Sequence, residues 1–187
     1  LGLHLSKSII FIMYRGIIIL CLLMVLFSCA KNKVIDTSPS SLSFGTDETL
    51  DIVTWNVENF PKQNDITIDY LAELIDSMNV DIIALQEIES ETDFMNLINK
   101  LDDWEGYRAN SASFNINLAL LYSNNLEVES IYEIFEDDWW SFPRSPLVAQ
   151  IVWNGQNVYI INNHFKAMGG TENEDRRKSA SEKLENY

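Results

Sequence analysis

The feature that most constrains the fold is an alternation between two apolar spacings, which begins at residue 50. Residues 50–60 alternate apolar and polar side chains, as a strand does, whereas residues 65–80 carry apolar side chains at helical spacing. The same pair of patterns recurs in residues 81–88 and 90–101. The later predicted elements are strands over 117–123, 126–134, 146–153 and 157–165 and a helix over 171–187. This order predicts an α+β domain with helices packed outside strands.

Local signals mark where several of these elements begin. Asp65 is a plausible N-cap of the first helix, and Ser90 with Asp93 resembles a capping box at the start of the second. The stretch NGQN, residues 154–157, is typical of a hairpin turn between the last two strands.

The N-terminal residues predict a targeting signal. Residues 13–28 combine an arginine, a short apolar run and a small residue, and the stretch LFSC that ends at Cys29 resembles a bacterial lipobox. We therefore expect 1–12 to be upstream sequence, Cys29 to carry lipid, and the polar stretch 29–48 to tether the domain to the bacterial envelope, on its periplasmic or extracellular side. An uncleaved anchor and a plain secretory signal are the alternatives.

The charge of the chain weighs against a simple nucleic-acid-binding surface. Its formal net charge is −15, so no broad basic face is expected. Acidic enzymes that act on phosphates overcome this repulsion locally, with a metal ion and a few placed cations. The charge is therefore compatible with metal-assisted phosphodiester chemistry. Both cysteines, Cys21 and Cys29, lie in the N-terminal segment, which excludes a disulfide framework in the remainder.

Polar residues follow the apolar stretches of two of the predicted strands. Asn56 follows the apolar stretch of the first strand, and Glu87 follows that of the second. Neighbouring strands that end at one edge bring an amide oxygen and a carboxylate together, and such oxygen ligands suit Mg²⁺ better than zinc. The alternative interpretation is an ordinary loop asparagine and a helix-capping glutamate.

Two cationic or titratable residues lie near later strands. Arg144 stands between two prolines. Prolines restrict the local backbone, so an arginine held there loses less entropy when it binds an anion. His164 ends the last strand, where a histidine can donate a proton to a leaving oxygen. A solvated arginine and a structural strand-ending histidine are the alternatives.

Five motifs together resemble the endonuclease/exonuclease/phosphatase superfamily of metal-dependent phosphoesterases. They occur in family order over residues 49–187, and they are WNVEN (55–59), LQEI (85–88), LALLYS (118–123), RSPLVAQI (144–151) and NNHFK (162–166). The resemblance implies a four-layer α/β/β/α sandwich with mixed β-sheets, of which only the N-terminal half is present. We expect the first sheet alone to be complete, with an exposed apolar inner face.

The resemblance also implies roles for the candidate residues. Asn56 helps to place the metal and the phosphate, Glu87 binds the metal, Arg144 contacts the substrate phosphate, and His164 assists near the scissile bond. The implied cofactor is Mg²⁺, or another divalent cation such as Mn²⁺ or Ca²⁺. The family's later GDxN and DH motifs are not in this sequence. The chain is therefore expected to be truncated and inactive alone.

The resemblance favours a secreted or surface-anchored endonuclease, with nucleic acid or another phosphodiester as substrate and the membrane as a partner through its lipid. Alternatives are a phosphatase or lipid phosphodiesterase on the same fold, a non-catalytic surface lipoprotein, and a fragment with no stable fold. Trp139 and Trp140 are interpreted as a stacking platform, a membrane-facing edge or buried residues. No oligomer is predicted.

Overall fold

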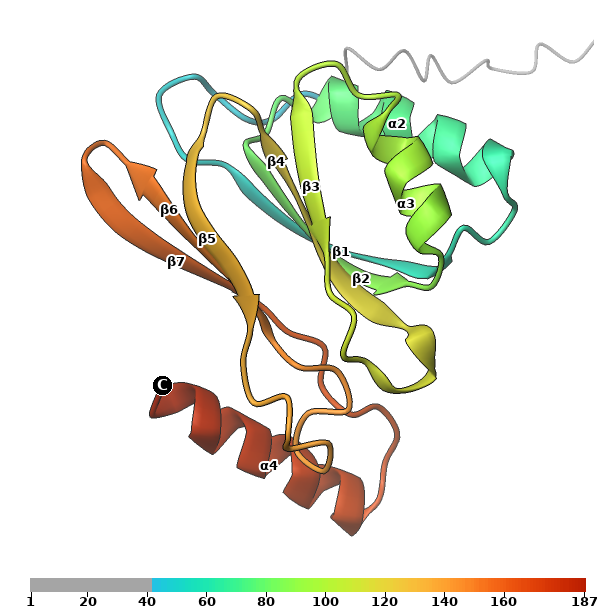
Figure 1. Cartoon of the computed structure of the whole chain (residues 1–187), viewed down its shortest axis with the longest axis vertical. Helices are drawn as coiled ribbons and strands as arrows, with labels where there is room; N and C mark the ends of the chain where they lie inside the picture. The colour runs from blue at the N-terminus through green and yellow to red at the C-terminus, as the bar shows by residue number, and fades with distance from the viewer. Residues whose placement is uncertain (1–41) are drawn as a thin grey trace, which may run out of the picture. The chain divides into compact units, whose positions relative to one another are not determined.

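The computed structural model describes residues 42–187 (Figure 1). The predicted leader, Cys29 and most of the tether lie outside these residues. The elements are β1 (Ile52–Phe60), α2 (Asp65–Met78), β2 (Ile82–Ile88), α3 (Glu91–Ile98), β3 (Trp104–Arg108), a 3-10 turn η2 (Ser113–Asn115), β4 (Asn117–Ser123), β5 (Glu127–Glu133), β6 (Leu147–Trp153), β7 (Gln156–Asn162) and α4 (Thr171–Glu185). Within residues 42–187, no helix has the length and apolar character needed to cross a bilayer.

The first sheet has four strands in the order β1-β2-β4-β3. β1 and β2 are parallel, with Asn56 opposite Gln86, whereas β4 is antiparallel to both β2 and β3. The sheet is therefore mixed, as predicted. Because β1 and β2 run in the same direction, their carboxyl ends meet at one edge of the sheet.

Helices α2 and α3 cover the outer face of this sheet (Figure 1). Their apolar faces pack on outward-pointing residues of β2 and β4, among them Ile83, Leu85 and Leu121, all fully buried. Gly106 allows α3 to lie close to β3, because an added Cβ there would come within 2.7 Å of the Ile98 side chain.

The second sheet is antiparallel, in the order β5-β6-β7. β6 and β7 are joined by the predicted turn, where Asn154 and Gly155 both have positive φ, of 50° and 75°. Two consecutive residues in that conformation match the right-handed twist of a hairpin.

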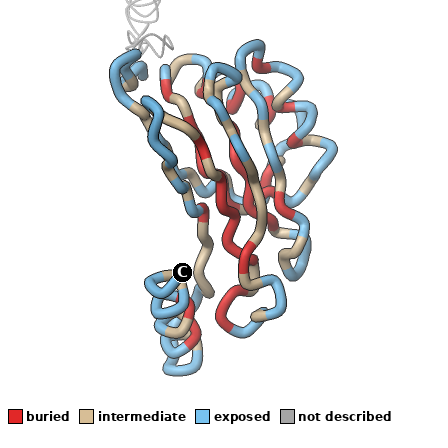
Figure 2. Tube along the Cα trace, turned by 60° about the vertical axis from the view of Figure 1, so that its left-hand side comes forward, coloured by how far each residue is buried: buried red, intermediate tan, exposed pale blue. Residues whose placement is uncertain are grey.

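The two sheets pack face to face and enclose a second apolar cluster. Its buried residues come from β2, β4 and β6 and the residue after β3, and they are Ile82, Ala84, Ala109, Leu118, Leu120, Leu147, Ala149 and Ile151. Figure 2 shows the buried segments running through these central strands. The prediction of an exposed apolar inner face is therefore wrong for β2 and β4, because three contiguous strands already cover them. On β1, by contrast, Ile52 remains 45% exposed.

Helix α4 lies beyond the end of the second sheet rather than across its outer face (Figure 1). It buries only Arg176 and Ala180. Its contacts with the rest of the domain are mostly polar: Ser179 hydrogen-bonds to Ser141, and Lys183 pairs with Asp138. Two residues after the helix, the Tyr187 hydroxyl hydrogen-bonds with that of Tyr132.

Two local predictions need correction. β3 was not predicted, because it is a five-residue, half-buried edge strand interrupted by Gly106. Asp65 is not the N-cap of α2: Asn64 holds that position, without a side-chain capping bond, and Asp65 is the first helical residue. The cap at Ser90 is confirmed, since its hydroxyl accepts a hydrogen bond from the Asp93 N–H at 3.2 Å.

Candidate active site

The parallel ends of β1 and β2 bring Asn56 and Glu87 into direct contact. Asn56 Nδ2 donates to Glu87 Oε1 at 3.0 Å, and the backbone N–H of Asn59 donates to Glu87 Oε2 at 3.2 Å. Asn56 Oδ1 itself accepts a hydrogen bond from the Glu58 N–H at 2.9 Å. The amide of Asn56 therefore orients the Glu87 carboxylate while its own oxygen is held by the backbone.

The backbone around these residues is strained. Glu58, Asn59 and Glu87 have φ values of 48°, 55° and 68°, in the left-handed region that costs non-glycine residues free energy. The strand pairing shifts register between Asn56 and Phe60, so this end of the β1–β2 ladder is bulged. Bulges re-aim side chains at the rims of sheets, and here the strain accompanies a carboxylate turned toward its neighbours.

His164 and Arg144 approach Glu87 from the second sheet. His164 follows β7 by two residues, and its Nε2 lies 3.8 Å from Glu87 Oε1. The Arg144 side chain, three residues before β6, is close enough for its charge to act on His164 and for the charge of Glu87 to act on it. The structure thus brings together all four predicted residues of the folded part.

Burial changes the pKa values of His164 and Arg144. It lowers the pKa of His164 below its ordinary value, the neighbouring Arg144 lowers that pKa further, and Glu87 raises it. Burial also lowers the pKa of Arg144, against the opposing effect of Glu87. His164 is therefore mostly neutral at pH 7, and it presents one N–H donor rather than a full positive charge.

Several buried polar atoms near the site have no partner among residues 42–187. They include Arg144 Nε, His164 Nδ1 and Asn163 Oδ1. Buried polar groups are normally hydrogen-bonded, so an unpaired guanidinium donor beside a carboxylate has a physical explanation if an anion completes the site.

The donor set fits a hard cation held by one carboxylate. Residues 42–187 contain no cluster of three or more histidine, cysteine or acidic side chains placed to hold a metal. Glu87 is the acidic residue at the site, with its side chain 20% exposed. Mg²⁺ commonly uses one or two carboxylates and takes its other ligands from water and substrate phosphate, so Glu87 suits it.

One family model matches most of the folded part of the chain. It is the Endonuclease/Exonuclease/phosphatase family, and it covers residues 53–182, which include all four candidate residues. The chain belongs to the endonuclease/exonuclease/phosphatase family. Enzymes of this family hydrolyse phosphoesters and generally use divalent metal ions. No curated protein sequence matches the chain significantly.

Solved structures of this family share the fold. The TM-score is 0.61 with humanized D. rerio TDP2, at 16% identity over 72% of this chain and 54% of that one. It is 0.54 with a family protein from Bacteroides thetaiotaomicron, at 12% identity over 73% and 56%. It is 0.53 with the human Nocturnin catalytic domain, at 19% identity over 73% and 58%. The chain therefore spans a little over half the length of these proteins.

Arg108 lies beside the candidate site and was not among the residues predicted from the sequence. Its guanidinium donates to carbonyl oxygens of Ile88 and Glu89, directly after Glu87, at 2.9–3.3 Å. It also reaches the backbone oxygen and Oδ1 of Asn115 at 3.2 and 3.0 Å. Arg108 therefore ties the segment after Glu87 to the loop before β4, which no sequence signal indicated because β3 itself was not predicted.

A pair of arginines on α4 holds two loops that adjoin the site. Arg176 donates to the backbone oxygens of Trp140 and Trp139, at 2.5 and 3.2 Å, and its guanidinium carbon lies 5.9 Å from the centre of the Trp139 ring. Arg177 donates to the oxygens of Lys166 and Met168 at 3.0 and 2.8 Å. The loops that follow His164 and precede Arg144 are thus anchored to one helix.

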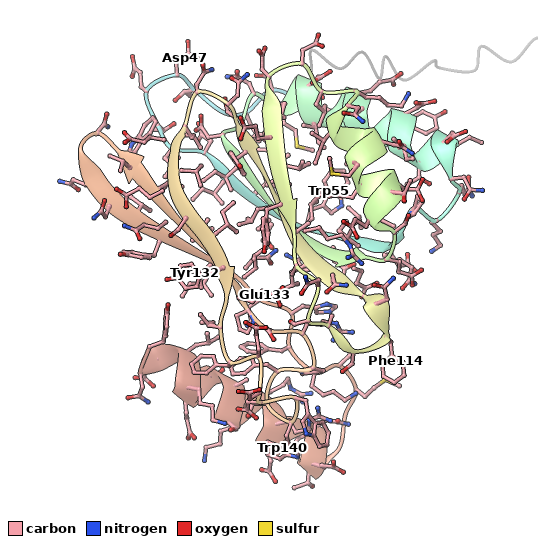
Figure 3. All side chains as sticks on the ribbon, in the orientation of Figure 1. Asp47, Trp55, Phe114, Tyr132, Glu133 and Trp140 are labelled. Carbon is pink, nitrogen blue, oxygen red and sulfur yellow. The ribbon has the colours of Figure 1, made fainter. Side chains whose placement is uncertain are left out.

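The tryptophans of the loop before Arg144 are not core residues. Trp139 is 68% exposed and Trp140 37%. Figure 3 shows Trp140 and Phe114 at one end of the domain and Asp47 at the opposite end. The alternative that these tryptophans are buried is therefore wrong.

Proposed function

We propose that the complete protein hydrolyses phosphodiester bonds in nucleic acid with the help of a divalent cation, Mg²⁺ in the first instance. The observation that carries this proposal is the convergence of Glu87, Arg144 and His164 from two different sheets onto one point, with Glu87 Oε1 3.8 Å from His164 Nε2. A carboxylate, a neutral histidine 3.8 Å from it and an arginine whose charge acts on that histidine match the needs of phosphoryl chemistry.

Each residue has a distinct task in this proposal. Glu87 holds the cation, which when bound neutralises charge on the phosphoryl group and on the leaving oxygen. Arg144 binds a non-bridging phosphate oxygen through the buried Nε–H that lacks a partner. His164, neutral at pH 7, donates one hydrogen bond to a phosphate oxygen. Asn56 keeps the Glu87 carboxylate in a single orientation through its 3.0 Å hydrogen bond.

Nucleic acid is the substrate class that we propose to test first. One fold relative, D. rerio TDP2, has been solved in complex with a single strand DNA product, with a TM-score of 0.58 at 16% identity. The exposed Trp139 offers an aromatic surface on the loop that leads to Arg144, and bases stack on such surfaces. These two observations support a single-stranded or unpaired substrate.

The deciding experiment compares Glu87→Gln with the wild type in the full-length protein. The variant should lower metal-dependent cleavage of a DNA oligonucleotide at least about 100-fold, equivalent to about 2.7 kcal/mol of transition-state stabilisation. A matched control is Glu127→Gln, an exposed glutamate at the start of β5. EDTA should abolish wild-type cleavage. Unchanged activity in Glu87→Gln, or activity that survives EDTA, contradicts the proposal.

The same assay separates the competing activities on this fold. Sugar phosphates report a phosphatase, and phospholipids with phosphodiester head groups report a lipid phosphodiesterase. Turnover of either above that of DNA would replace the nuclease proposal while leaving the metal chemistry intact. No turnover of all three would favour a non-catalytic surface protein.

We also propose that the mature protein is lipid-anchored at Cys29 in the bacterial envelope. The support is the LFSC stretch and the polar segment that follows it. Metabolic labelling with radioactive palmitate should mark the wild type and not Cys29→Ser. Equal labelling of both proteins would exclude Cys29 as the lipid site.

A further inference from the structure

Glu87 and His164 belong to different sheets, so their separation depends on how the sheets dock. The apolar cluster between the sheets drives their association, but burial of apolar surface is non-directional and tolerates small slides. Holding Glu87 Oε1 and His164 Nε2 at 3.8 Å requires directional contacts between the sheets, such as hydrogen bonds. The inner faces of the sheets contain one such feature near the site.

Asn162 and Gln86 form a buried polar bridge between the sheets. They are 3% and 7% exposed. Asn162 Nδ2 donates to the carbonyl oxygens of Leu85 and Ala119, at 2.8 and 2.9 Å, and Gln86 Nε2 donates to Asn162 Oδ1 at 2.8 Å. Because Leu85 and Ala119 are partners in the β2–β4 ladder, one amide from β7 spans two strands of the opposite sheet.

The orientation of the bridge is fixed by its acceptors. An oxygen of Asn162 turned toward the two carbonyls would be repelled by both, so the NH₂ group must face them and Oδ1 must face Gln86. Gln86 Nε2 also lies 2.9 Å from the Ala84 oxygen and 3.1 Å from Thr54 Oγ1, so one of its two hydrogens is shared between two acceptors. Three strands of the first sheet are thereby connected to the end of β7.

The bridge lies next to both functional groups along the chain. Gln86 immediately precedes Glu87, and Asn162 precedes His164 by two residues. A sliding movement of one sheet would break several short hydrogen bonds and leave buried polar groups unpaired, which is costly. The bridge therefore resists the movement that would change the distance between Glu87 and His164.

We propose that Gln86 and Asn162 are positioning residues that set the separation of Glu87 and His164. The inference concerns the site of the proposed hydrolase and rests on that proposed function for its catalytic meaning. Its geometric content does not depend on activity. The competing interpretation is that the bridge only stabilises the fold.

The test uses variants that remove the bridge from either side. Gln86→Met keeps the length of the side chain and removes its donors, and Asn162→Ala removes both donors and the acceptor. The matched control is Ile151→Ala, which removes buried apolar contact between the sheets on β6 without touching the bridge. All three should lower the melting temperature, so stability alone decides nothing.

The first readout is spectroscopic and needs no substrate. In the full chain, the side-chain amide resonances of Asn56 report the position of Glu87, because Asn56 Nδ2 donates to it. The ring resonances of His164 report the position of the His164 side chain itself. We expect both sets to shift or broaden in Gln86→Met and Asn162→Ala and to stay at wild-type positions in Ile151→Ala.

The second readout is the kinetics of the full-length protein on bis(p-nitrophenyl) phosphate with Mg²⁺, well below every melting temperature. The bridge variants should lose about tenfold or more in kcat with little change in KM, and the double variant should lose no more than the stronger single one. Wild-type resonances and kcat in a folded bridge variant would overturn the proposal. An inactive wild type would overturn the proposed function, and the resonances would still decide the role of the bridge.

Discussion

Asn56 donates a hydrogen bond to Glu87 at 3.0 Å while its own carbonyl oxygen accepts one from the backbone of Glu58. The amide thus serves as an orienting group for the carboxylate. Groups that orient a metal ligand typically contribute 10- to 100-fold to metal affinity.

We therefore predict that Asn56→Ala weakens binding of Mg²⁺ or Mn²⁺ by about 10- to 100-fold, because Glu87 loses its side-chain donor. Isothermal titration of the full chain measures this. Asn157→Ala, an exposed asparagine on β7, should bind the metal as the wild type does. Equal affinity for all three proteins would show that Glu87 is oriented by the backbone of Asn59 alone.

The pH dependence of stability should carry the signature of His164. Its pKa is lowered in the folded state, chiefly by burial, so the folded protein binds this proton less readily than the unfolded chain does. The free energy of unfolding should therefore rise with pH between the lowered folded pKa and the unfolded value of about 6.5.

Melting curves between pH 5 and pH 8 test this sign. The wild type should lose stability as the pH falls through that window, and His164→Gln should lose less, because it removes a group that resists protonation. If the two proteins gave parallel curves, the environment of His164 would not disfavour its charged form.

Replacing Arg108 should destabilise the region around the site more than a typical surface substitution. We expect Arg108→Met to lower the free energy of unfolding by about 2–3 kcal/mol, because several carbonyl acceptors lose a charged donor. Arg108→Lys should restore little, since an ammonium group cannot reproduce the guanidinium fork. Lys100→Met, which removes a solvent-exposed pair with Asp69, should change the free energy of unfolding much less than Arg108→Met does. Urea denaturation compares the three, and full recovery by lysine would refute the geometric argument.

Trp139 should contribute to binding of a single strand. We predict that Trp139→Ala weakens binding of an oligothymidylate about tenfold in EDTA, where no cleavage occurs, because stacking contributes about 1–3 kcal/mol per base. The dependence on salt should be shallow, since a chain of net charge −15 gains little from phosphate neutralisation. Tyr70→Ala, an aromatic residue 65% exposed on α2, is the control. Unaltered binding by Trp139→Ala would show that the exposed Trp139 ring does not stack on the bases.

Sequence patterns predicted most elements because each carries its own periodicity. The cap at Ser90 and the Asn154-Gly155 turn followed from local chemistry, and both are confirmed. The strand Trp104–Arg108 did not, since five residues with a central glycine give too short a pattern. That omission also hid Arg108, whose partners lie on separate segments.

The candidate site could be proposed from strand ends, but its geometry could not. Asn56 and Glu87 meet because β1 and β2 are parallel, which sequence order suggested. The inward-facing Gln86 and Asn162 were visible as polar residues on otherwise apolar strand faces, and that signal was not used. Their pairing joins residues 76 positions apart, and only the docking of the sheets reveals it.

Helix α4 is fastened to the domain mainly by arginine, lysine and hydroxyl contacts, with Ala180 as its one buried apolar residue. Salt screens charged contacts and leaves apolar cores intact, so α4 should open as a separate cooperative unit below the global unfolding free energy. Native-state hydrogen exchange would then show its amides exchanging early. When α4 opens, it releases the loops beside Arg144 and His164 together. Heat or salt would therefore displace these two side chains from Glu87 while both sheets remain folded.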